Sequence, residues 1–68
     1  MKAKNVKVGM KVLVKNKVDS LFLGRNLGMV GVVNEVVADE NHIWLKFDHG
    51  GLDYGTPQDL KRIKEQSQ

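Results

Sequence analysis

Cysteine is absent from this chain of 68 residues, which excludes two common ways of stabilising a small protein. There is no disulfide framework and no thiolate metal site, so zinc ribbons are excluded and hydrophobic packing has to supply the stability. The two histidines, His42 and His49, lack a metal-ligand spacing. We therefore expect no metal ion and no cofactor, and the composition fits a reducing, cytoplasmic location.

Long apolar runs are also missing. Nowhere does the chain approach the roughly 20 apolar residues that a membrane-spanning helix needs, and the basic residues 1–7 are not followed by the apolar core of a signal peptide. The glycine-rich segment around Arg25 lacks the Gly-Lys-Ser or Gly-Lys-Thr ending of a P-loop, and no serine or histidine lies in a catalytic pattern. We expect neither membrane association nor enzymatic activity.

Positive charge is present but unevenly distributed along the chain, whose formal net charge is +3. Residues 1–31 contain seven basic residues and one acidic residue, whereas residues 32–60 contain six acidic residues and one lysine. Lys61, Arg62 and Lys64 make the end basic again. A fold that brings the two basic parts together would form a cationic face able to attract phosphates; the alternative is that these lysines serve only solubility.

Alternation of apolar and polar residues predicts short strands and almost no helix. Met10, Val12 and Val14 alternate with lysines, and Ile43, Leu45 and Phe47 alternate with His42, Trp44 and Lys46. The predicted strands cover residues 10–15, 29–38, 42–47, 52–54 and 61–64, with a single helical turn at residues 56–60. We predict an all-β fold, a small five-stranded barrel of residues 1–64 with a one-turn helix before its last strand, followed by a disordered tail at residues 65–68.

Residues 24–36, G-R-N-L-G-M-V-G-V-V-N-E-V, carry three glycines that lead into a valine-rich strand. Gly24, Gly28, Gly31, Val33 and Val36 occupy the positions of the KOW motif, which this segment resembles. The resemblance implies an SH3-like barrel whose glycine loop contacts RNA, DNA or protein in ribosomal proteins and elongation factors. The chain departs from that motif at Leu27, where a basic residue is usual, and at Met29.

The first functional hypothesis is a non-enzymatic nucleic-acid-binding accessory module of the transcription or translation machinery. Trp44 beside Lys46 is suited to stacking on an unpaired base while pairing with phosphate. Arg25 is a candidate to bind a phosphate or a carboxylate through two N–H groups. Asn26 either joins it in binding or serves only as a turn residue in the left-handed conformation. The candidate binding residues are Lys11, Lys15, Lys17, Arg25, Asn26, Trp44 and Lys46.

The second hypothesis is a protein-interaction module, an SH3-like adaptor of the kind that a phage or mobile element can encode. Its candidate interface is the apolar group Leu21, Phe22, Leu23 and Met29, which could also close a homodimer. The position of Trp44 stays open, since its ring either lies at the surface or packs beneath residues 21–23. Tyr54 either plugs one end of the barrel or joins Trp44 at the surface.

Overall fold

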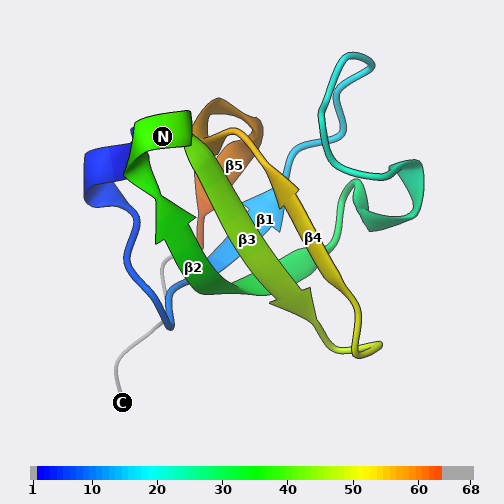
Figure 1. The fold of residues 1–68 in the computed structure, drawn as a ribbon. Coiled ribbons are helices and arrows are strands. Elements are labelled where there is room, and N and C mark those ends of the chain that lie inside the picture. Colours follow the sequence, from blue (N-terminus) through cyan, green and yellow to red (C-terminus); the bar gives the residue numbers. More distant parts are fainter. Residues whose placement is uncertain (1, 64–68) are drawn as a thin grey trace.

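A computed structural model describes residues 2–63 as one curved antiparallel sheet of five strands (Figure 1). The strands, which pair in the order β4-β3-β2-β1-β5, are β1 (Lys11–Val14), β2 (Val30–Val37), β3 (His42–Phe47), β4 (Leu52–Gly55) and β5 (Leu60–Arg62). Single 3-10 turns lie at η1 (Ala3–Asn5), η2 (Gly24–Asn26), η3 (Ala38–Glu40) and η4 (Pro57–Asp59). The predicted all-β fold, its five strands and the helical turn before the last strand are confirmed.

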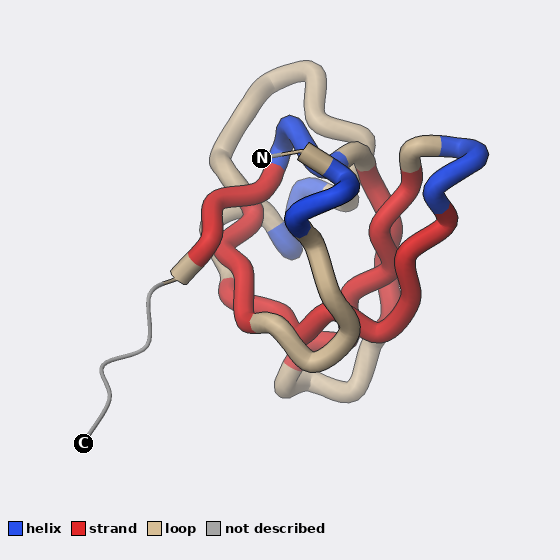
Figure 2. The backbone as a smooth tube through the Cα atoms, turned by 90° about the vertical axis from the view of Figure 1, so that its left-hand side faces the viewer, coloured by secondary structure: helices blue, strands red, loops and turns tan. Residues whose placement is uncertain are grey.

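The sheet curls around its core, so that strands from both ends of the sheet face each other across it (Figure 2). In residues 2–63 the strand order leaves β4 and β5 as the two edges, and closure into a complete barrel therefore stays a prediction. The strand boundaries differ slightly from those predicted: β2 begins and ends one residue inside residues 29–38, and β5 begins at Leu60. The tail expected at residues 65–68, together with Lys64, lies outside the described residues.

The core is formed by the inward-facing residues of the alternating strands, as the pattern predicts. Val12 and Val14 of β1 are fully buried while Lys11 is exposed, and every second residue of β3 is buried. The buried apolar side chains are Val6, Val12, Val14, Phe22, Val33, Ile43, Leu45, Phe47 and Leu60. In residues 2–63 no helix is long and apolar enough to cross a membrane.

A β-bulge interrupts the alternation of β2. Val33 pairs with Leu45 and Glu35 pairs with Trp44, so β2 advances two residues where β3 advances one. Asn34 is the additional residue, and both Asn34 and Glu35 are exposed. The bulge therefore turns Glu35 to the outer face of the sheet, next to Trp44, and the sequence pattern did not reveal it.

The glycines of the KOW-like segment have two different structural roles. Gly28 has a φ of +80°, a left-handed conformation that side chains rarely adopt. Gly31 lies against the inner face, where an added Cβ would come within 3.0 Å of the Phe47 ring and 3.2 Å of Leu45. Two of the three glycines are thus explained by the turn into β2 and by packing, without reference to a ligand.

The connection between β1 and β2 folds back over the edge of the sheet at β4. Phe22 is buried, with 4% of its surface exposed, and its ring covers Gly55 of β4. A Cβ at Gly55 would overlap that ring. The absence of a side chain at Gly55 is therefore what allows the loop to close on β4.

Substituting Gly55→Ala is expected to lower the free energy of unfolding by about 1–3 kcal/mol, because Phe22 has to leave its position. Urea denaturation measures this change. Gly24→Ala is the matched control, since a Cβ there meets nothing within 4 Å and the φ of Gly24 is not positive. Equal stability of the two variants would contradict the packing of Phe22 on Gly55.

Candidate nucleic-acid interface

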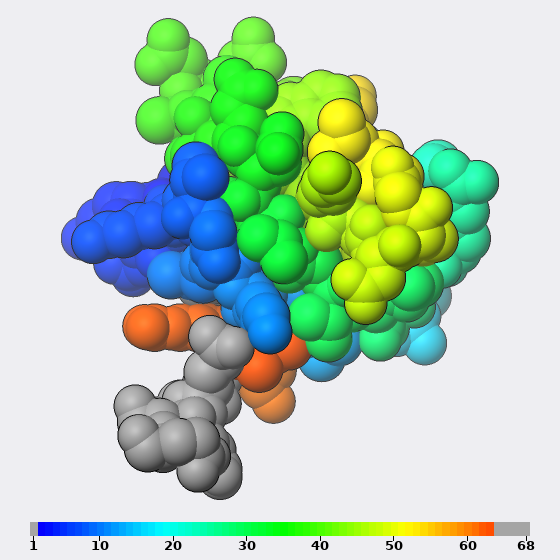
Figure 3. Space-filling view, turned by 90° about the horizontal axis from the view of Figure 1, so that it is seen from below, coloured from blue at the N-terminus to red at the C-terminus, as the bar shows by residue number. Residues whose placement is uncertain are grey.

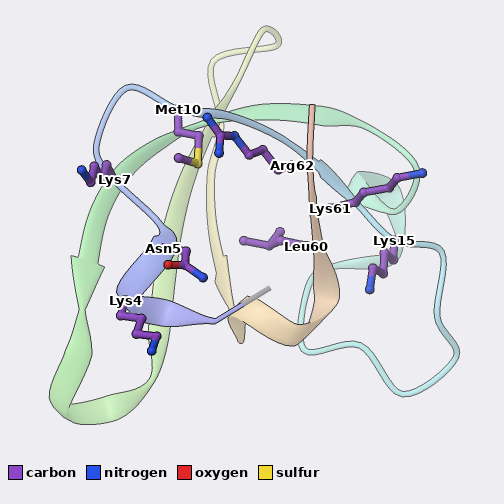
Figure 4. Close-up of a pocket in the computed structure, with 8 residues that line it drawn as sticks. All are labelled: Lys4, Asn5, Lys7, Met10, Lys15, Leu60, Lys61 and Arg62. Carbon is purple, nitrogen blue, oxygen red and sulfur yellow. The ribbon is translucent and has the colours of Figure 1, made fainter. Parts of the chain in front are cut away.

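A concave surface rich in positive charge lies between the N-terminal segment and β5. We call it the basic groove; it has a volume of about 760 Å³ and is lined by Lys4, Asn5, Lys7, Met10, Lys15, Leu60, Lys61 and Arg62. Leu60 lies in the middle, with the N-terminal residues on one side and Lys15 and Lys61 on the other (Figure 4). Five of the eight lining residues are basic and none is acidic.

Strand pairing brings these residues together from both ends of the chain. β1 pairs with β5, so that Val12 lies opposite Arg62 and Leu13 opposite Lys61. The backbone N–H of Lys15 also donates to the Asp59 carbonyl at 2.8 Å, which holds Lys15 beside the start of β5. The blue N-terminal segment and the orange β5 consequently lie on the same side of the molecule (Figure 3).

The N-terminal segment is fixed to the sheet by its own contacts. The side chain of Val6 is buried in the core, and the backbone N–H of Gly9 donates to the Val33 carbonyl at 2.9 Å. The N–H of Met10 donates to the Lys7 carbonyl at 3.1 Å. Lys4 and Lys7 are therefore held on an ordered backbone, and in residues 2–63 the fold brings basic residues from both parts of the chain to one surface.

Most of the basic residues selected from the sequence lie elsewhere. Lys15 lines the basic groove, and its Nζ lies 3.4 Å from the carbonyl of Gln58. Lys11 and Lys46 are exposed on the outer face, on either side of Val32 in one row across β1, β2 and β3. The sequence selection missed four basic lining residues, although the charge distribution pointed to them: Lys4, Lys7, Lys61 and Arg62.

Lys17 is engaged in an ion pair. Its Nζ lies 3.1 Å from Oδ1 of Asp59, a carboxylate that is almost fully buried, and Thr56 Oγ1 donates to Oδ2 of the same carboxylate at 3.0 Å. Burial raises the pKa of Asp59. Hydrogen bonds from Lys17, Thr56 and the Leu21 backbone, together with the positive charge of Lys17, outweigh this effect and hold the pKa below its ordinary value. Lys17 thus serves the fold rather than the groove.

Asn26 is a structural residue and not the accessible binding residue that the sequence suggested. It is 1% exposed; its Nδ2 donates to Asp53 Oδ2 at 2.8 Å, and its Oδ1 lies 3.0 Å from His49 Nε2. Since His49 Nδ1 accepts from the Gly51 N–H at 3.2 Å, Nε2 carries the proton and donates to Asn26. Both ends of the Asn26 amide are therefore occupied within the protein.

The expected left-handed conformation of Asn26 is also wrong. In residues 2–63 the one non-glycine residue with a positive φ is Asn41, at 55°, where the chain turns from η3 into β3. Arg25, by contrast, is exposed and lines a shallow hollow with His49, Gly50 and Gly51. Of the two loop residues proposed from the sequence, Arg25 alone is accessible to a partner.

Trp44 and Tyr54 lie together on the outer face of β3 and β4. Their ring centroids are 4.8 Å apart with an interplanar angle of 31°, and the ring of His42 lies 4.9 Å from that of Tyr54. Trp44 is half-buried and Tyr54 is 37% exposed. Of the alternatives left open by the sequence, Tyr54 joins Trp44 at the surface.

The apolar interface proposed as the alternative is divided by the fold. Phe22 is buried and therefore unavailable to a partner, whereas Met29 is partly buried and packs against the core. Leu21 and Leu23 are half exposed. The candidate interface of four residues is therefore wrong at Phe22, and Leu21 and Leu23 are its most exposed members.

In residues 2–63 no group of three or more histidine, aspartate or glutamate side chains is arranged to hold a metal ion. Comparison of the chain with protein-family models, curated proteins and solved structures finds no match.

Replacement Asn26→Ala is expected to lower the free energy of unfolding by about 1–3 kcal/mol, because it removes one of the donors to the buried Asp53 carboxylate. Chemical denaturation measures the loss, and Asn16→Ala, at an exposed position, is the matched control. An unchanged stability of Asn26→Ala would show that the loop is not held through this amide.

The lowered pKa of Asp59 predicts a pH dependence of stability. Since the folded-state pKa lies below the unfolded one, the stabilisation is present at neutral pH and is lost as the pH falls from about 5 through the folded-state pKa. Asp59→Asn should be less stable than the wild type at pH 7, with a difference that shrinks on acidification. Thermal unfolding at several pH values tests this, with the exposed Asp48→Asn as control; a difference independent of pH would contradict it.

Proposed function

We propose that the protein is a non-enzymatic nucleic-acid-binding accessory module that holds a phosphate backbone in the basic groove. The observation that carries this proposal is the groove itself, in which five basic side chains from both ends of the chain line one surface without an acid. Neutralising phosphates there would release counterions, which is the main source of affinity in sequence-independent binding. The lack of cysteine is compatible with action in the cytoplasm.

The chemistry of the residues that line the groove favours contacts to the phosphates of a nucleic acid over contacts to its bases. Apart from its cations, the groove offers Asn5, Met10 and Leu60, and no aromatic ring on which a base could stack. Lysine and arginine side chains on a concave surface position a strand through its phosphates and carry little sequence information. The module would therefore bind many sequences with similar affinity.

The KOW-like segment supports the proposal indirectly. Its glycines form the turn into β2 and the packing against Phe47, which is a scaffold role compatible with membership of an SH3-like family. Leu27 and Met29 pack against the core, and the loop offers Arg25 as its one exposed cation. The groove, rather than the motif loop, is the better candidate for the phosphate contact.

Charge reversal in the groove tests the proposal. Binding of fluorescent single- and double-stranded RNA and DNA is measured by anisotropy at 50 and 150 mM salt, for the wild type and for the double variant Lys7→Glu, Arg62→Glu. Loss of two phosphate contacts should reduce the slope of log K against log salt by about 2 and weaken binding similarly for all sequences.

The matched control is Arg25→Glu with Lys46→Glu, which changes the net charge equally at two exposed residues outside the groove. Its slope should change much less. Equal losses in the two double variants would show that overall charge, not the groove, determines binding. If the wild type binds none of the four nucleic acids in a salt-dependent way, the proposal is wrong.

A further inference from the structure

The outer face of β3 and β4 carries a cluster of aromatic rings that the basic groove does not use. We call His42, Trp44 and Tyr54 the aromatic face; Tyr54 lies 4.9 Å from the ring of His42 and 4.8 Å from that of Trp44. All three side chains are partly exposed. Since no residue of this face lines the groove, it is a separate surface with its own chemistry.

Carboxylates adjoin the aromatic face. The bulge in β2 places Glu35 directly opposite Trp44, in a row that continues across β3 to Tyr54. Directly opposite residues on the same face of two paired strands are close enough for their side chains to touch, so Glu35 can contact Trp44. Glu40 lies 3.5 Å from His42 Nδ1. In residues 2–63 Glu35 forms no ion pair, so its carboxylate is available to a ligand.

Lys46 is the cation nearest to this face along β3. It lies two residues beyond Trp44, in the next row, between Val32 and Leu52. Trp44 thus has Glu35 opposite it on β2. Along β3, His42 with its partner Glu40 lies on one side of Trp44, and Lys46 lies on the other. Glu35 lies in the same row as the Trp44 and Tyr54 rings, whereas Lys46 and Lys11 lie in the next row, so the charge nearest to the rings is unfavourable for the phosphates of a stacked nucleotide.

We propose that the aromatic face binds an arginine side chain of a partner protein, with the guanidinium against the Trp44 and Tyr54 rings and its N–H groups toward Glu35. Guanidinium is planar, stacks on aromatic rings and pairs with carboxylates through two N–H groups, so both features of the face recognise it together. Lysine has the same charge but lacks the planar fork. The inference does not depend on nucleic-acid binding in the groove.

The single tryptophan of the chain makes a direct test possible, because its fluorescence reports on this face alone. The probe is a blocked Gly-Gly-Arg-Gly-Gly peptide, titrated at constant ionic strength, with the lysine and citrulline peptides for comparison. Citrulline keeps the shape of arginine without its charge. We expect a saturable change of Trp44 emission with arginine, with a dissociation constant on the order of 1 mM, weaker binding of lysine and no response to citrulline.

Two variants assign the response to Glu35. Glu35→Gln should weaken arginine binding by about fivefold, the equivalent of one exposed ion pair. Asp39→Asn, which removes the same charge from the exposed η3 turn, is the matched control and should leave binding unchanged. Equal effects of the two variants would overturn the role of Glu35, and the absence of any arginine response would overturn the proposal.

A parallel titration with single-stranded oligonucleotides tests the alternative occupant of the aromatic face, a nucleic-acid base stacked on Trp44. If an oligonucleotide quenches Trp44 and the arginine peptide does not, the face stacks bases and the proposal is wrong. The groove variant Lys7→Glu, Arg62→Glu should respond to the arginine peptide as the wild type does. Its nucleic-acid binding is measured separately, so failure of the groove proposal and failure of this one are distinguishable.

Discussion

The buried carboxylate of Asp53 is the interaction on which the arrangement of the loop and sheet edge depends. Its Oδ2 accepts from the Leu23 N–H and from Asn26 Nδ2, and its Oδ1 accepts from the Tyr54 N–H, each at 2.8 Å. Burying a carboxylate is costly unless it is hydrogen-bonded, and three donors supply that compensation. Because Asp53 lies on edge strand β4, the same bonds tie the glycine loop to that edge of the sheet.

The pairing of β1 with both β2 and β5 turns the uneven distribution of charge along the sequence into an uneven distribution on the surface. The basic N-terminal segment leads into β1, and the pairing of β1 with β5 brings the C-terminal cations to the same side. Glu35 on β2 and Asp39 and Glu40 at the β2–β3 turn do not line the basic groove. One surface therefore favours anions and another favours cations, although the net charge is small.

The sequence predicts those parts of this fold that depend on local pattern. Alternation located β1 and β3, and the proline that begins η4 located the last turn. The role of Asn26 could not be predicted, because its partners Asp53 and His49 lie 27 and 23 residues away and asparagine is usually exposed. The ion pair between Lys17 and Asp59 is similarly long-range, and it removed one predicted binding lysine from the candidate site.

The bulge at Asn34 can be understood from the sequence once the register is known. Without the additional residue, alternation from Val33 would turn Glu35 into the core opposite Ile43 and leave Asn34 opposite Trp44. Burying an unpaired carboxylate costs several kcal/mol, whereas a bulge forgoes about one ladder hydrogen bond, or about 1 kcal/mol. The spacing of Val33 and Val36, which both face the core, therefore requires the bulge. The same requirement places a carboxylate beside Trp44, so the packing of the core decides which charge the aromatic face can accept.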